Sequence, residues 1–543
     1  MQEENQKEEQ KNTEQEDSAV KPEVINKEVT NQEEKVSAVI PGIEEDIEIT
    51  GTEKLRPLEE VAREDSDEIK KIIKDRVDTD PGFTMNYNNP LYKDARTCAV
   101  KIICRYERSD AYIDKLLDIE FRNNHLLNDF DKSLLNEIVH GVVRWLRRLD
   151  WFLNGFYRGN YEKCVPEVKN AMRVALYQIL FLSKIPYPAA VNEAVEYVKR
   201  IHGDKHAGVV NGLLRTIIRT LDSLVWPTRE IDEVNYLGII QSHPNWLVRR
   251  WVQRYGFDNA QKLCEANNKR PSITMRYNKL KITEKEFTDY LTGKGLVFAK
   301  TNYIDGYYNV KIFSKIYEDD FFKKGYFTIQ DESAGLVSLL VDPKPNDLIL
   351  DVCAAPGGKS LHMRELADGK ANILAVDKYL LKAENMKKNF DRLGIENIVP
   401  LHDDVSSPAT EALTKKFIER FDKVLVDAPC SGLGVLSKKP DIKWKRNSED
   451  ILNLQKIQLE ILECSVKYLN KNGVLIYSTC TIEPEENIEV VEMFLENHPE
   501  FKIDNAEKYV KKELVNEKGC IETYPHINNI DGAFAVRLTR IQI

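Results

Sequence analysis

The sequence predicts a multidomain chain in which an all-helical domain and a small α+β domain precede an α/β domain with a doubly wound parallel sheet. Its 543 residues exceed the size of one hydrophobic core and suggest about three or four folding units. Apolar residues recur at helical spacing in the first half of the chain, and strand-like and helix-like segments alternate after Gly325. A hydrophobic fraction of 42% excludes collagen-like, fibrous and wholly disordered proteins.

The first 70 residues carry most of the negative charge. They hold 22 acidic and 9 basic residues, whereas the remaining residues hold 66 acidic and 69 basic ones. A segment with so much charge and so few aromatic residues buries little apolar surface, so we expect residues 1–80 to form a disordered acidic tail. A solubilising extension is the simpler interpretation of this tail, and a partner-binding segment is the alternative.

Residues 89–226 show helical periodicity and almost no strand signal. Apolar side chains at three- and four-residue steps predict one long helix over residues 134–149, and further helices over residues 168–182, 189–201 and 207–221. The domain also has surplus arginines, which can contact the phosphates of a nucleic acid or simply face the solvent. They are Arg144, Arg147, Arg148, Arg215 and Arg219.

Residues 240–322 mix the two patterns and predict a small α+β domain. The helical segment PNWLVRRWVQRYG leads into the strand candidates RPSITMRYNKL and VFAKTNY, and the helix candidate TEKEFTDYLTGKG lies between these two strands.

Residues 323–543 carry five apolar strand candidates that are separated by helix-length segments. The strands are LILDV, NILAV, NIVPL, KVLVD and GVLIYST. Such alternation is typical of a parallel, doubly wound sheet. Because ligands of these sheets bind beyond the carboxyl ends of the strands, we expect functional residues directly after them.

The first strand runs into a turn of small residues, DVCAAPGGKS, which admits two interpretations. The GGKS end resembles the end of a phosphate-binding P-loop, which would make the protein an NTPase. A P-loop would need glycine where this chain has Cys353, and Pro356 lacks a backbone N–H that could cradle phosphate. The turn therefore favours a nucleoside cofactor without a phosphate chain.

Acidic residues follow the next two strands. Asp377 ends the second strand, where a carboxylate can accept hydrogen bonds from both ribose hydroxyls. Asp403 and Asp404 end the third strand and can receive the exocyclic amine of an adenine, although a solvated acidic turn would explain this pair taken alone. Together with the small-residue turn, these acids predict a site for S-adenosylmethionine.

Two cysteines follow the fourth and fifth strands. Cys430 lies in DAPCSGLG and Cys480 lies in YSTCTIEPEEN, 50 residues later. A single cysteine after a strand is usually a small buried apolar residue, but two at neighbouring strand ends predict thiol chemistry. The nine cysteines are odd in number and form no CxxC pair, so we expect neither a disulfide framework nor a thiolate zinc site.

Thiols are useful for methyl transfer to carbon 5 of a cytosine. This carbon is a poor nucleophile until a thiolate adds to carbon 6 and pushes electrons onto carbon 5. The carbon 5 proton must then leave and the thiol must be eliminated, so we expect a second polar group nearby to assist these steps. Asp427, near Cys430, can hold the amine and ring nitrogen of the cytosine. A methyltransferase that acts on oxygen or nitrogen needs neither thiol.

The segments DVCAAPGGKS, DAPCSGLG and STCTIEPEEN strongly resemble the RNA cytosine-C5 methyltransferases of the Sun (Fmu) family. The segment NEAVEYVKRIHGDKHAGVVNGLLR resembles the NusB-type RNA-binding domain, and the resemblance covers residues 92–543. It implies an α/β Rossmann-like class I methyltransferase domain that uses S-adenosylmethionine, preceded by a NusB-like all-helical domain and a small RNA-recognition extension. The implied substrate is 16S ribosomal RNA, either naked or in an early precursor of the small subunit.

The resemblance also implies roles for individual residues. Cys480 would be the nucleophile, and Cys430 would assist product release, with Asp427 beside them. The residues implied in cofactor binding are Cys353, Ala354, Ala355, Pro356, Gly357, Gly358, Lys359, Asp377, Asp404 and Asp427. No metal is implied, and no histidine has metal-like spacing.

A basic cluster follows the Cys430 segment and can hold an RNA backbone. It consists of Lys438, Lys439, Lys443, Lys445 and Arg446. Trp444, in the middle of the cluster, is expected to pack in a core.

We expect a cytoplasmic monomer. No segment reaches the roughly 18 apolar residues of a membrane helix, and the first residues do not resemble a signal peptide. The alternatives are the same chemistry on tRNA or 23S ribosomal RNA, a P-loop NTPase, and a non-catalytic RNA-binding assembly factor. The intact Cys430 and Cys480 argue against the last of these.

Overall fold

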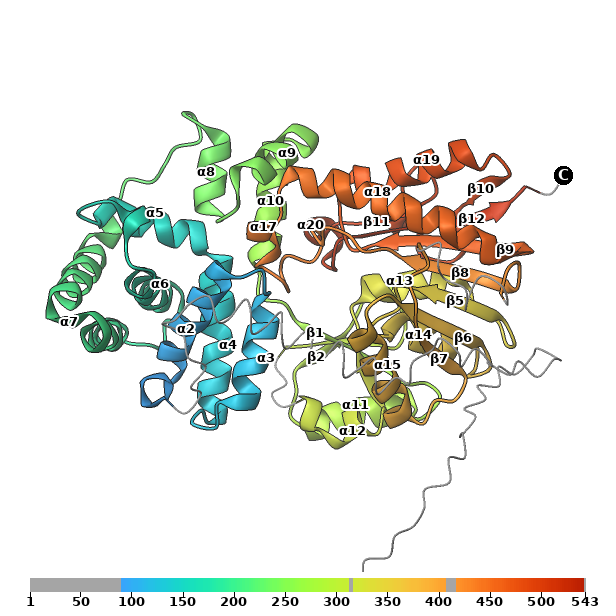
Figure 1. Cartoon of the computed structure of the whole chain (residues 1–543), viewed down its shortest axis with the longest axis horizontal. Helices are drawn as coiled ribbons and strands as arrows, with labels where there is room; N and C mark the ends of the chain where they lie inside the picture. Colours follow the sequence, from blue (N-terminus) through green and yellow to red (C-terminus); the bar gives the residue numbers. More distant parts are fainter. Residues whose placement is uncertain (1–88, 312–315, 407–416, 542–543) are drawn as a thin grey trace, which may run out of the picture.

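The computed structural model describes residues 89–311, 316–406 and 417–541, so the predicted acidic tail lies outside the described residues. The described chain forms a helical domain on one side, a large sheet on the other, and a small sheet beside the large one (Figure 1). Among these residues, no helix is both long and apolar enough to cross a membrane.

The helical domain confirms the prediction of an all-helical fold. Its helices are α2 (Ala95–Arg108), α3 (Ile113–Asn123), α4 (Asp129–Arg144), α5 (Leu146–Phe156), α6 (Pro166–Phe181) and α7 (Tyr187–Thr220). Their apolar faces meet in one core, as the periodicity predicts. The helices predicted over residues 189–201 and 207–221 are the two arms of α7, which is kinked at Gly203, where φ is 77°.

The single long helix predicted across α4 and α5 is wrong, because the chain leaves helical geometry at Trp145. The break leaves backbone N–H and carbonyl groups at the end of α4 and the start of α5 without helical partners, and groups from distant parts of the chain form hydrogen bonds with them. The hydroxyl of Ser242 accepts the N–H of Arg147 at 3.1 Å, at the start of α5. The indole N–H of Trp444 donates to the carbonyl of Val143 at 2.7 Å, near the end of α4. Local periodicity contains no sign of such partners.

Three helices connect the helical domain to the rest of the chain: α8 (Glu233–Ile240), α9 (Asn245–Tyr255) and α10 (Phe257–Asn268). A small antiparallel sheet follows, in the order β2-β3-β1-β4. Its elements are β1 (Ile273–Tyr277), α11 (Glu284–Gly293), β2 (Phe298–Lys300), β3 (Tyr307–Val310), α12 (Asp320–Lys323) and β4 (Phe327–Ile329). This sheet confirms the predicted α+β character, with β1, α11 and β2 at the predicted segments.

The large sheet has the order β10-β12-β9-β8-β5-β6-β7, with β11 paired to β12. Its first five strands are parallel to one another and coincide with the five predicted strands: β5 (Leu348–Val352), β6 (Asn372–Asp377), β7 (Ile398–His402), β8 (Phe421–Asp427) and β9 (Leu469–Thr479). The antiparallel strands that complete it are β10 (Phe501–Asp504), β11 (Ile521–Thr523) and β12 (Ala533–Arg540).

Helices cover the large sheet and carry the chain between its strands (Figure 1). They are α13 (Glu332–Val341), α14 (Gly358–Leu366), α15 (Leu380–Leu393), α18 (Ser448–Ser465) and α19 (Ile488–Asn497). Two short helices, α17 (Ile442–Lys445) and α20 (Pro525–Asn528), instead pack beside the connecting helices. The apolar side chains of the sheet are buried in two cores. This doubly wound arrangement brings the carboxyl ends of β5 to β9 to one edge.

Candidate active site

The two cysteines at the strand ends meet at this edge. Strands β8 and β9 are parallel neighbours, with Asp427 opposite Ser478, and a cysteine follows each strand. The sulfur atoms of Cys430 and Cys480 lie 3.1 Å apart, and the backbone N–H of Cys480 donates to the sulfur of Cys430 at 3.3 Å. The prediction that these two strand ends are neighbours is confirmed.

The surroundings of the two thiols differ. The hydrogen bond from Cys430 lowers the pKa of Cys480, and the nearby Lys359 ammonium lowers it further. The same hydrogen bond, together with burial, raises the pKa of Cys430 well above its ordinary value. Cys480, which is exposed, is therefore the thiol of the pair that ionises more readily. Burial raises the pKa of Cys353 to about 12, so this third thiol is inert at neutral pH.

Lys359 and Asp427 form an ion pair beside the cysteines. The ammonium of Lys359 lies 2.6 Å from Asp427 Oδ2, and the hydroxyl of Ser478 donates to Asp427 Oδ1 at 2.9 Å. Burial opposes the charge on Lys359, but the neighbouring Asp427 raises its pKa overall. Both oxygens of Asp427 thus hold a donor from the protein, and its contact with a cytosine stays a prediction.

The small-residue turn between β5 and α14 folds tightly against the neighbouring strand and helix. The backbone N–H of Ala354 donates to the carbonyl of Val376 on β6 at 2.8 Å. Gly357 has a φ of 93°, and a Cβ atom at this position would lie 2.6 Å from the ring of Phe390. Both the conformation and the close approach require glycine.

Acidic residues lie at the ends of β6 and β7, and the adjacent Asp403 and Asp404 differ in their hydrogen bonding. Asp377 Oδ1 accepts the N–H of Tyr379 at 3.0 Å, and the Asp377 side chain is only 5% exposed. Asp404 Oδ1 accepts the hydroxyl of Ser406 at 2.6 Å, whereas the buried Asp403 Oδ2 has no hydrogen-bond partner among the described residues. Asp404, the residue implied by the resemblance, is therefore the better satisfied of the pair.

These residues fit an adenosine-type cofactor. Besides Asp403 Oδ2, the buried Asp351 Oδ1 at the end of β5 lacks a partner within the described parts of the chain. Burial raises the pKa of Asp351 to about 7. Unsatisfied carboxylate oxygens at a ligand-binding edge are acceptors for the hydroxyl and amine protons of a nucleoside.

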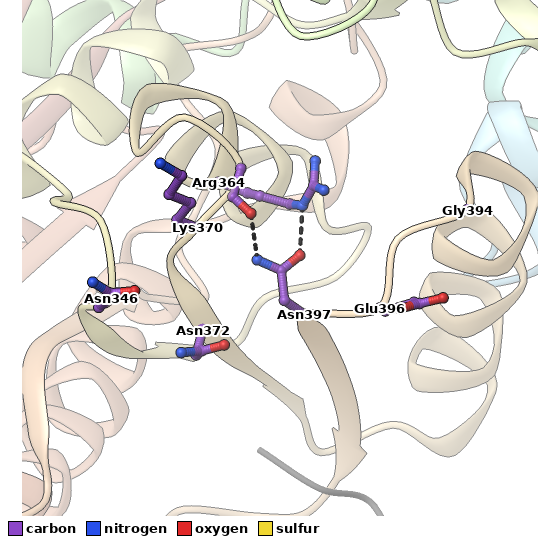
Figure 2. A pocket seen from close by; sticks show the side chains of 8 residues that line it. Asn346, Arg364, Lys370, Asn372, Gly394, Glu396 and Asn397 are labelled. Atoms are coloured by element: carbon purple, nitrogen blue, oxygen red, sulfur yellow. Dashed lines mark hydrogen bonds between the residues drawn. The ribbon is translucent and has the colours of Figure 1, made fainter. Parts of the chain in front are cut away.

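A cavity of about 620 Å³ lies at the opposite end of the same strands. Asn346 before β5, Asn372 at the start of β6 and Asn397 before β7 line it, and Figure 2 shows Asn397 bound to Arg364. None of the predicted site residues lines this cavity. It is therefore separate from the cysteine edge.

The guanidinium groups of the arginines of α4 and α5 contact other parts of the protein, which corrects the expectation of a solvent-facing basic surface there. Arg144 is only 8% exposed and donates to the carbonyl of Ser437, in the segment after Cys430, at 2.7 Å. Arg147 donates to the carbonyl of His243 at 2.6 Å. Arg148 lies over aromatic rings of its own domain. These guanidinium groups hold domains and helices together.

Arg215 and Arg219 on α7 differ from these arginines because they are exposed. They form only local hydrogen bonds, to Asn211 and Thr216 respectively. Their contact with phosphates stays a prediction.

The predicted basic cluster is largely part of the interface with the helical domain. Lys443 is 1% exposed and donates to the carbonyl of Arg144 at 3.0 Å. Lys438 is held between the carboxylates of Asp331 and Asp531. Trp444 packs against the core of the helical domain, which confirms its predicted role. Lys443 is therefore too buried to hold an RNA backbone, and that role for Lys438 stays a prediction.

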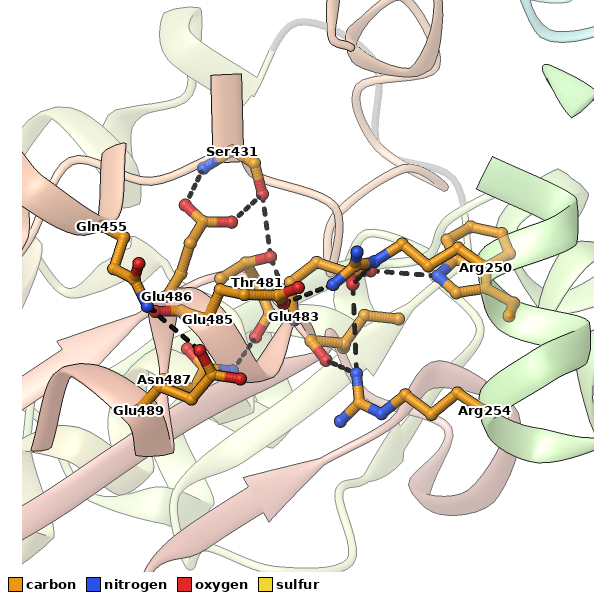
Figure 3. Close-up of polar contacts among 12 residues, drawn as sticks. Arg250, Arg254, Ser431, Gln455, Thr481, Glu483, Glu485, Glu486, Asn487 and Glu489 are labelled. Atoms are coloured by element: carbon orange, nitrogen blue, oxygen red, sulfur yellow. Dashed lines mark hydrogen bonds and ion pairs between the residues drawn. The ribbon is translucent and has the colours of Figure 1, made fainter. Parts of the chain in front are cut away.

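Sequence reasoning missed a polar network around the segment after Cys480 (Figure 3). The buried Glu486 accepts the N–H of Ser431 at 2.7 Å, and the hydroxyls of Ser431 and Thr481 lie 2.8 Å apart. Glu483, also buried, pairs with Arg250 of α9. The run of acids in IEPEEN, directly after a candidate nucleophile, was the available signal. In the described ranges, no three His, Cys, Asp or Glu side chains are grouped to hold a metal ion.

The chain matches known families in three segments. Residues 338–539 match the family described as 16S rRNA methyltransferase RsmB/F, residues 93–219 match the NusB family, and residues 243–306 match the ferredoxin-like domain of RsmF/B-like methyltransferases.

Individual relatives extend over most of the chain. The probable ribosomal RNA small subunit methyltransferase B of Bacillus subtilis (strain 168) is 36% identical over 448 residues, which is 81% of this chain and 97% of the relative. The ribosomal RNA small subunit methyltransferase B of Serratia proteamaculans (strain 568) is 33% identical over 76% of this chain and 92% of its own length. The crystal structure of PH0851 has the same fold, with a TM-score of 0.69 and 24% identity over 82% of this chain and 99% of that one.

Proposed function

Because the chain belongs to the RsmB/F family of 16S rRNA methyltransferases, we propose that it methylates carbon 5 of a cytosine in 16S ribosomal RNA through a covalent bond to Cys480. It is a methyltransferase that depends on S-adenosylmethionine and carries a NusB domain and a ferredoxin-like domain. The choice of cytosine carbon 5 and the thiol mechanism are what the proposal adds to this family assignment.

The observation that carries the proposal is the pair of sulfur atoms 3.1 Å apart at the ends of β8 and β9. A methyl acceptor with its own lone pair, such as an oxygen or nitrogen, needs no covalent activation. Carbon 5 of a cytosine does need it, and a thiolate is a suitable nucleophile for carbon 6. The pKa of Cys480 is lowered and that of Cys430 is raised, so the two thiols suit different steps of the reaction.

The first step that we propose is attack by the Cys480 thiolate on carbon 6. A carbon–sulfur bond forms, and the electron pair of the 5,6 double bond moves onto carbon 5 and the ring. S-adenosylmethionine supplies an electrophilic methyl group on its sulfonium. Carbon 5 takes this methyl group, and the electrons of the broken bond stay with the departing sulfur. Asp377, Asp404 and the 353–359 turn would hold the cofactor, and Asp427 would hold the amine of the cytosine.

The second step releases the product. In the adduct, Cys480 is an uncharged thioether, so the hydrogen bond with the Cys480 thiol and its negative charge, which both raise the pKa of Cys430, are lost. Cys430 can then lose its proton to solvent and accept the proton of carbon 5. The electrons of that C–H bond rebuild the double bond, and the carbon–sulfur bond breaks to return the Cys480 thiolate. The target base must leave its stack to reach these thiols, as is usual for enzymes that act on bases.

A mechanism-based substrate tests the proposal. In 16S ribosomal RNA transcribed with 5-fluorocytidine, carbon 5 carries fluorine in place of the proton, so release is blocked after methyl transfer. We expect a protein–RNA adduct that survives denaturation and requires S-adenosylmethionine. With ordinary RNA, digestion and mass spectrometry should show 5-methylcytidine. Methylation on nitrogen 4 or on a ribose, without an adduct, would contradict the proposal.

A further inference from the structure

Helix α9, which precedes the small sheet, packs against the loops that carry both cysteines. Leu433, three residues after Cys430, and Ile482, two residues after Cys480, are fully or almost fully buried in one core with α8, α9 and α10. The connecting helices therefore belong to the active-site edge as well as to the helical domain.

Polar contacts fix α9 to the segment after Cys480 (Figure 3). Arg250 forms ion pairs with both Glu483 and Glu485. The indole N–H of Trp251 donates to Glu483 Oε1 at 3.0 Å, and Arg254 donates to the carbonyl of Ile482 at 2.6 Å. The Glu483 side chain is 0% exposed, so Arg250 compensates a carboxylate that water cannot reach.

The same segment holds the Cys430 loop from its other side. Glu486 accepts the N–H of Ser431, the residue after Cys430, and the side-chain amide of Gln458 at 3.0 Å. The backbone N–H of Gly434 also donates to the carbonyl of Cys480 at 3.1 Å. A displacement of the segment that Arg250 holds would therefore change the spacing of the two sulfur atoms.

We propose that Arg250 is a positioning residue for the cysteine pair, which it acts upon through Glu483 and Glu485. This inference rests on the proposed role of Cys480 as the nucleophile. The amino-terminal end of α9 is itself held by the helical domain, because Arg147 of α5 donates to Asn245 Oδ1 at 2.6 Å. A single helix thus links the RNA-binding domain to the segment that orients the nucleophile.

The distance between the sulfur atoms of Cys430 and Cys480 is short, so a small displacement of either loop weakens the hydrogen bond between them. A hydrogen bond weakens steeply when its geometry is lost, and a misplacement of about 1 Å can reduce turnover by about a hundredfold. Loss of the bond from Cys430 removes the leading cause of the lowered pKa of Cys480, so that pKa rises. The Cys480 thiol then needs a higher pH to ionise.

The experiment compares Arg250→Gln with Arg249→Gln in the full chain. Arg249 is the adjacent, exposed residue of α9, so the second variant removes the same charge without touching the Glu483 contacts. For each protein, iodoacetamide alkylation of Cys480 is followed by mass spectrometry as a function of pH. The turnover number and the KM values for S-adenosylmethionine and for a 16S ribosomal RNA transcript are measured in parallel.

For Arg250→Gln we expect the alkylation midpoint to move to higher pH and the turnover number to fall at least about tenfold, with the KM for S-adenosylmethionine changed less than about twofold. Arg249→Gln should match the unaltered protein. An unchanged midpoint in Arg250→Gln, with or without a loss of turnover, would overturn the inference.

A second variant covers the case in which Arg250→Gln does not fold. Glu483→Gln keeps an acceptor for Trp251 and removes the buried charge that Arg250 compensates. We expect the same direction of change in midpoint and turnover, and a folded variant with the original midpoint would overturn the inference. A separate variant tests the proposed function itself. If Cys480→Ser still methylated RNA fully, Cys480 would not be the nucleophile, whatever the results for Arg250.

Discussion

The sulfur atom of Cys430 lies 3.1 Å from that of Cys480, and it also accepts the backbone N–H of Cys480 at 3.3 Å. This contact lowers the pKa of Cys480 and raises that of Cys430, so the two thiols differ in how readily they ionise. The more readily ionised Cys480 is suited to attack carbon 6, and Cys430 is suited to accept the carbon 5 proton later, once it has lost its own. Substitutions at the two positions should therefore stop the reaction at different points.

Cys480→Ala should abolish methylation without forming an adduct, because no sulfur attacks carbon 6. Cys430→Ala should instead accumulate methylated RNA that is joined to the protein, because release is impaired. A denaturing gel with labelled RNA distinguishes the two results, since only the second gives a shifted band. The reverse pattern would exchange the two roles, and no adduct in either variant would refute the covalent mechanism.

Lys359→Gln should shift the pH dependence of methyl transfer. The Lys359 ammonium lowers the pKa of Cys480, so its loss raises that pKa. Activity that depends on the thiolate is present above this pKa and lost below it, so the acidic limb of the pH–rate profile should move to higher pH. The loss of rate should be larger at neutral pH than at alkaline pH. Lys370→Gln, at the opposite end of the strands, is the matched control and should keep the original profile.

Asp377→Ala should weaken the binding of S-adenosylmethionine at least about tenfold. Each hydrogen bond from a ribose hydroxyl to this carboxylate contributes about 1.5 to 3 kcal/mol. Calorimetry with S-adenosylhomocysteine measures the change, and RNA affinity should barely move. The control is Asp391→Ala, which removes an exposed carboxylate from α15. Equal cofactor affinity in the two variants would place the ribose elsewhere.

The parallel part of the large sheet could be predicted because each apolar strand candidate is followed directly by residues that can bind a ligand or react. Each of β5 to β9 contains a short apolar run, and polar residues or cysteines follow where the strand ends. The carboxyl ends of parallel strands lie at one edge of a sheet, and ligands bind at that edge. These two rules are sufficient to predict from the sequence that Cys430 and Cys480 lie close together. The later antiparallel strands carry none of these site residues and were not predicted.

The contacts between domains could not be predicted in this way. Arg144 and Lys443 look like exposed basic residues in the sequence, yet the chain buries them against each other's backbone segments, 299 residues apart. Their partners are carbonyl groups, which every residue has and which no motif reveals. The break at Trp145 was missed because the side chains that bond to the helix ends there, Ser242 and Trp444, lie far away in the sequence.

The contacts of Arg148 with aromatic rings predict that this arginine contributes to the stability of the helical domain. Its guanidinium lies 4.8 Å from the ring centre of Trp226 and 5.4 Å from that of Trp145. Arg148→Glu places a carboxylate against these negative ring faces and should destabilise the protein by about 2 kcal/mol or more. Thermal unfolding measures this effect.

Charge reversal at both Arg215 and Arg219 should give the complementary result. Their side chains are exposed and bonded only within α7, so stability should change little. If they bind phosphates, the slope of log affinity for 16S ribosomal RNA against log salt should become shallower by about 1 for each phosphate that the variant no longer neutralises. Binding titrations at several salt concentrations test this, with Arg148→Glu as the comparison. An unchanged slope in the double variant would place the phosphate-binding surface on another face of the helical domain.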